Sequence, residues 1–81
     1  MYNDFIGNSV TVLVATKGDT VLEYVGILQG EDEKNIILQE VSIGTMLMNI
    51  QRGIFGGNVV QYKTNVAKVI INKEFIISCI Q

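Results

Sequence analysis

Residues 18–38 predict two β-strands joined by a short acidic turn; their sequence is GDTVLEYVGILQGEDEKNIIL. β-Branched and aliphatic residues on either side favour strands, and the polar run from Gly30 to Lys34 favours the turn. Gly26 lies in the middle of the first strand, where a glycine usually marks a bulge or a sharp bend. The segment therefore predicts a strongly bent hairpin, which a small barrel needs in order to close.

The rest of the chain continues the β pattern. The predicted strands span residues 10–15, 20–29, 35–41, 58–72 and 74–80, and residues 45–52 continue the third strand in an extended pattern. Residues 2–7 suffice for one short N-terminal helical turn, and no segment has the 3.6-residue apolar period of a long helix. We therefore predict that residues 1–81 form a single all-β domain, a small, strongly bent five-stranded barrel of the SH3-like type.

The last predicted strand is apolar on both faces. Simple alternation places Phe75, Ile77 and Cys79 on one face. It places Ile76 and Ile80 on the other. An exposed edge strand normally alternates with polar residues or is protected by Lys or Pro, and this strand has neither. Such an edge predicts pairing with a second copy, and head-to-tail repetition of that pairing closes a ring.

The composition argues against most enzyme chemistry. The chain has no His and a single cysteine, Cys79. The commonest general base, the commonest zinc ligand and any internal disulfide are therefore missing. We predict a protein that is not an enzyme, with no catalytic residue, no metal site and no cofactor, and Cys79 is expected to be a buried, inert thiol. No signal peptide or spanning segment is recognisable, so a cytoplasmic protein without membrane association is expected.

The residues around the acidic turn resemble the first sequence motif of the Sm/LSm family (Sm-like proteins, including the Hfq type). The matching residues are Gly26 and Leu28 before the turn, Asp32 within it, and Asn35 and Leu38 after it. The order of Lys73, Ile77 and Ile80 is similar to the second motif. The resemblance implies a homo-oligomeric ring of Sm-like barrels that binds single-stranded, U- or A-rich RNA at its pore. It also implies that Asn35 reads a base edge, Asp32 orients Asn35 and Lys73 neutralises phosphate.

Other residues favour a different function. The net charge is −2, Glu33 stands where relatives carry a base-stacking residue, and Glu74 stands where they carry glycine. Both carboxylates repel phosphate. Asn35 could instead bond backbone groups at the turn, and Lys73 could be a solvated turn lysine. The alternative function is a homo-oligomeric protein-interaction or assembly scaffold without nucleic-acid binding, with the methionine-containing hairpin 45–64 as the surface for a protein partner.

Overall fold

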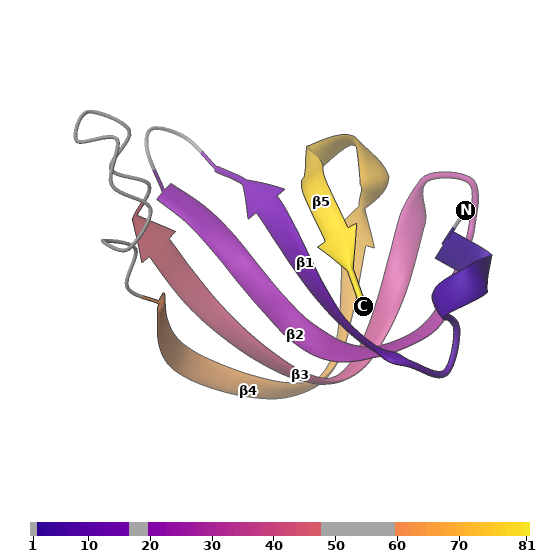
Figure 1. Cartoon of the computed structure of the whole chain (residues 1–81), viewed down its shortest axis with the longest axis horizontal. Helices are drawn as coiled ribbons and strands as arrows, with labels where there is room; N and C mark the ends of the chain where they lie inside the picture. Colours follow the sequence, from indigo (N-terminus) through magenta and orange to yellow (C-terminus); the bar gives the residue numbers. More distant parts are fainter. Residues whose placement is uncertain (1, 17–19, 48–59) are drawn as a thin grey trace.

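The computed structural model describes residues 2–16, 20–47 and 60–81 (Figure 1). Its elements are the 3-10 turn η1 (Tyr2–Phe5), the strands β1 (Ser9–Ala15), β2 (Thr20–Glu31), β3 (Asn35–Leu47) and β4 (Val60–Asn72), the 3-10 turn η4 (Lys73–Phe75) and the strand β5 (Ile76–Ile80). The prediction of five strands and one short N-terminal helical turn is confirmed. Residues 48–59 of the predicted hairpin 45–64 lie outside the described residues. No helix within the described ranges is long and apolar enough to cross a membrane.

All five strands belong to one antiparallel sheet with the order β4-β3-β2-β1-β5. The first four pair with their neighbours in the chain, and β5 returns to pair with β1. The long strands curve strongly, so the sheet is bent back over its own inner face (Figure 1). Over the described residues β4 and β5 are the two edges and do not pair with each other, so the sheet is open. The all-β prediction is confirmed, whereas a closed SH3-like barrel stays a prediction.

The core fills the inside of this bend and follows from the alternation of the strands. Its buried side chains are Val10, Val12, Val14, Leu28, Ile36, Leu38, Val41 and Ile71. Tyr2 and Phe5 of η1 pack against the same cluster. η1 is fixed there by backbone bonds, because Gly7 donates to the Leu28 carbonyl at 2.8 Å and Leu28 donates to the Asn8 carbonyl at 3.0 Å. The N-terminal turn is thus part of the core packing.

Gly26 lies where β2 and β3 approach each other closely. The pairing of these strands shifts register between Val25 and Ile27. A Cβ on Gly26 would lie 2.9 Å from the Gln39 carbonyl oxygen and 3.0 Å from a Val41 methyl carbon. Such distances leave no room for a side chain, so the sequence prediction of a bulge or close approach at this glycine is confirmed.

The predicted alternation of the last strand is wrong. Phe75 belongs to η4, and on β5 it is Ile76 and Cys79 that pack against the core. Ile77 and Ile80 are more than half exposed, at 54% and 60%. The reason is a register shift, in which Leu13 pairs with Ser78 but Val14 pairs with Ile76, so one extra residue breaks the alternation. Cys79 is half-buried, not fully buried as expected, and burial raises the pKa of its thiol.

Candidate nucleic-acid interface

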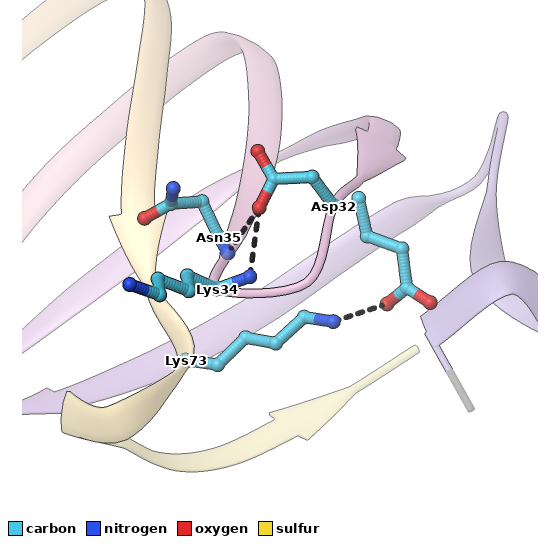
Figure 2. Close-up of polar contacts among 5 residues, drawn as sticks. Asp32, Lys34, Asn35 and Lys73 are labelled. Carbon is cyan, nitrogen blue, oxygen red and sulfur yellow. Dashed lines mark hydrogen bonds and ion pairs between the residues drawn. The ribbon is translucent and has the colours of Figure 1, made fainter.

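The acidic turn between β2 and β3 is built around the Asp32 side chain. Asp32 Oδ1 accepts hydrogen bonds from the backbone N–H groups of Lys34, at 2.8 Å, and Asn35, at 2.7 Å. The Asp32 N–H in turn donates to the Asn35 carbonyl at 2.9 Å. This is the geometry by which Asp commonly closes a turn on its own backbone. It fixes the backbone from which the Lys34 and Asn35 side chains project (Figure 2).

These hydrogen bonds lower the pKa of the Asp32 carboxyl. The largest cause is the bond from the Lys34 backbone, followed by the bond from the Asn35 backbone. Hydrogen bonds of this kind favour the charged form of a carboxyl group. Asp32 is therefore ionised at neutral pH and acts as the acceptor that organises the turn.

A second turn, η4, lies beside the first one. Asn72 is opposite Asn35 in the pairing of β3 with β4. The Asn72 side chain caps η4 by accepting a hydrogen bond from the Glu74 N–H at 2.8 Å. The Lys73 N–H donates to the Lys34 carbonyl at 2.8 Å, which ties the two turns together through their backbones.

An open polar groove runs between the two turns. Its volume is about 350 Å³, and it is lined by Glu33, Lys34, Asn72, Lys73 and Glu74. That volume lies near the lower end of the range of small-ligand sites, roughly 300–1,000 Å³. No group of three or more acidic, Cys or His side chains converges here or elsewhere among the described residues in a way that could hold a metal ion.

The structure brings together the backbones of the three residues predicted for the site, but not all their functional groups. Asp32 holds the backbone of Asn35, as required for an orienting role. The Lys73 ammonium instead lies 3.3 Å from Glu31 Oε2 and 5.4 Å from the centre of the Tyr2 ring. Figure 2 shows the Lys73 side chain directed away from the side to which the Lys34 and Asn35 side chains extend. Lys73 is thus neither a solvated turn lysine nor a cation directed toward Asn35.

Sequence reasoning missed the residues that surround Lys73. The Asn72 cap carries a recognisable signal, since Asn before a short helical turn is a common N-cap. Glu31 carries none, because a register shift between Leu28 and Gly30 decides which way it faces. The shift places Glu31 opposite the core residue Ile36. Residues opposite each other in a pair share a face, so Glu31 is turned inward, within reach of Lys73.

Comparison of the chain with protein-family models finds no match, and comparison with curated proteins finds none either. The likeness to Sm/LSm proteins therefore depends on the motif residues quoted above.

Proposed function

We propose that this chain is an Sm-like protein that assembles head to tail into a homo-oligomeric ring. The observation that carries the proposal is that both edges of the bent sheet are open and that each edge strand carries exposed isoleucine. On β5, Ile77 and Ile80 are 54% and 60% exposed, and on β4, Ile70 is 63% exposed. Edge strands of this kind template pairing with another chain unless they are protected.

The two edges differ, which determines the kind of assembly. If β4 of one copy pairs with β5 of the next, each added copy leaves one edge of either type open. A heterologous contact of this kind ends only when the last copy closes on the first. Light scattering at micromolar concentration tests the ring: we expect a single species of several subunits, and a monodisperse monomer would contradict the proposal.

For the ring we propose weak binding of single-stranded, U- or A-rich RNA at the groove between the turns. Asn35 offers an amide that can read a base edge, and the Asp32 hydrogen bonds hold its backbone in place. Lys73 is the phosphate contact expected from the sequence. The test is filter binding of oligo-U and oligo-A at low salt. Asn35→Ala should weaken binding, while Gln39→Ala, which removes an exposed amide further along β3, should not.

The second candidate is an assembly scaffold that binds no nucleic acid. It is favoured by the charges of the groove, where Glu33 and Glu74 face any bound phosphate and the Lys73 ammonium is already paired with Glu31. The same measurements separate the two functions. A stable ring that retains neither oligonucleotide at low salt would support the scaffold and remove the RNA function. A protein partner would then be sought at the hairpin 45–64, of which residues 48–59 lie outside the described part.

A further inference from the structure

The Lys73 ammonium compensates a carboxylate oxygen that water does not reach. Glu31 Oε2 is shielded from solvent and accepts no hydrogen bond within the described residues. Lys73 Nζ, at 3.3 Å, is the charge that stabilises it. The Lys73 side chain is only 27% exposed and the Glu31 side chain only 15%. Moving the ammonium to a phosphate would leave this shielded oxygen without its partner, which is unfavourable.

Lys73 also connects distant parts of the chain. Its ammonium contacts Glu31 at the end of β2 and the Tyr2 ring of η1. Its backbone N–H holds the Lys34 carbonyl in the acidic turn. A residue with these three contacts fixes the N-terminal turn and the acidic turn to η4. The fold determines the position of Lys73, and its charge is already paired with the Glu31 carboxylate.

Lys34 has the opposite surroundings. It is exposed, it lines the groove, and no ion pair joins its ammonium to any residue in the described ranges. It precedes Asn35 directly, and Figure 2 shows the Lys34 ammonium and the Asn35 amide extending to the same side of the turn. Two of the hydrogen bonds that shape this turn come from the backbone N–H groups of these same two residues.

We infer that Lys34, in place of Lys73, neutralises the phosphate of RNA bound at Asn35, and that Lys73 is a positioning residue. The inference rests on the proposed RNA function of the groove. Among the residues that line the groove, Lys34 is then the one cation not paired with a carboxylate, and it faces the carboxylates of Glu33 and Glu74. This balance of charge predicts binding that is weak and confined to low salt. The ligand class is single-stranded RNA whose base contacts Asn35 and whose adjacent phosphate contacts Lys34.

The salt dependence of oligo-U binding tests this assignment, because each phosphate that the protein neutralises adds to the slope of log K against log salt. We compare the unaltered chain with Lys34→Met and Lys73→Met, which keep aliphatic length and remove the charge. Lys34→Met should reduce the slope by roughly 0.7–1 for each phosphate that it no longer neutralises. Lys73→Met should leave the slope unchanged in the folded ring. A slope reduced by Lys73→Met and unaffected by Lys34→Met would overturn the inference while leaving RNA binding in place.

Urea unfolding provides the second measurement and does not depend on RNA. Lys73→Met and Glu31→Gln should each lower the urea midpoint, and the double variant should be destabilised by less than the sum of the two single effects. Lys34→Met should keep the original midpoint. Additive effects in the double variant would overturn the positioning role. If the unaltered chain binds no oligonucleotide, the RNA function and the Lys34 assignment both fail, and the unfolding cycle still decides whether Lys73 is a positioning residue.

Discussion

At the scale of single residues, Gly26 shows how little space the bend leaves for a side chain between β2 and β3. An added Cβ would meet the Gln39 carbonyl oxygen at 2.9 Å, and a backbone atom cannot move aside as a flexible side chain can. We expect Gly26→Val to lower the free energy of unfolding by roughly 2–4 kcal/mol, through backbone strain and overpacking. The measurement is a urea denaturation curve.

Gly30 on the same strand is the matched control. Nothing lies within 4 Å of a Cβ added there. Gly30→Val should therefore change stability by less than about 1 kcal/mol, the span of strand propensity. An unchanged or raised urea midpoint for Gly26→Val would mean that β2 and β3 do not approach closely at this point.

Glu40 is a second residue-scale prediction, because its backbone is left-handed with a φ of 53°. This conformation costs a residue with a Cβ roughly 1–2 kcal/mol, and glycine adopts it freely. We expect Glu40→Gly to keep or raise the urea midpoint. The neighbouring exposed residue provides the contrast, since Gln39→Gly should reduce stability by up to about 1 kcal/mol through the greater freedom of the unfolded chain. Equal reductions in stability for Glu40→Gly and Gln39→Gly would contradict the prediction.

At the scale of elements, the sequence was sufficient wherever a local pattern decides the structure. Valines at every second position of β1 mark its buried face, and the polar run after Gly30 marks the acidic turn. Register shifts between strands leave no such pattern, because they depend on pairing partners far along the chain. One shift invalidates the predicted faces of β5, and another turns Glu31 inward toward Lys73. The turn of the candidate site was therefore predictable, and the ion pair beside it was not.

The acidic turn supplies the element-scale prediction, which concerns pH. The pKa of Asp32 is lowered from its ordinary value of 3.8 by the backbone hydrogen bonds that it accepts. A carboxyl group whose pKa falls on folding stabilises the protein above its unfolded pKa, and this contribution disappears as the pH falls through the lower folded pKa. Asp32→Asn should thus reduce stability at neutral pH and match the unaltered chain at pH values well below 3.8.

Urea midpoints measured from neutral to acidic pH check this prediction. Glu33→Gln is the control, because it removes a carboxylate from the same turn but no acceptor of the two backbone hydrogen bonds. If the stability difference between Asp32→Asn and the unaltered chain stays constant across the whole pH range, the charge of Asp32 does not support the turn.

At the scale of the whole molecule, the open edges of the sheet link the stability of one copy to its assembly with other copies. A chain of 81 residues has a small core, and burying apolar edges against another copy is a common way to stabilise such a domain. Among the described side chains, the exposed large apolar residue on β4 is Ile70, and those on β5 are Ile77 and Ile80. None of them contributes to the buried core cluster, so each can be replaced without opening the interior.

Pairing of β4 of one copy with β5 of the next predicts a result that a symmetric dimer does not predict. Ile77→Lys should block the β5 edge and Ile70→Lys the β4 edge, since a lysine placed in a strand-pairing surface must lose its hydration. Each variant alone should be monomeric by light scattering, whereas Ile6→Lys, at an exposed isoleucine outside both edges, should keep the assembled mass. Mixed in equal amounts, the two edge variants should form a dimer and nothing larger, because the mixture contains one intact β4 edge and one intact β5 edge that fit each other. A mixture that stays monomeric, or either variant that dimerises alone, would rule out pairing of β4 with β5 between copies.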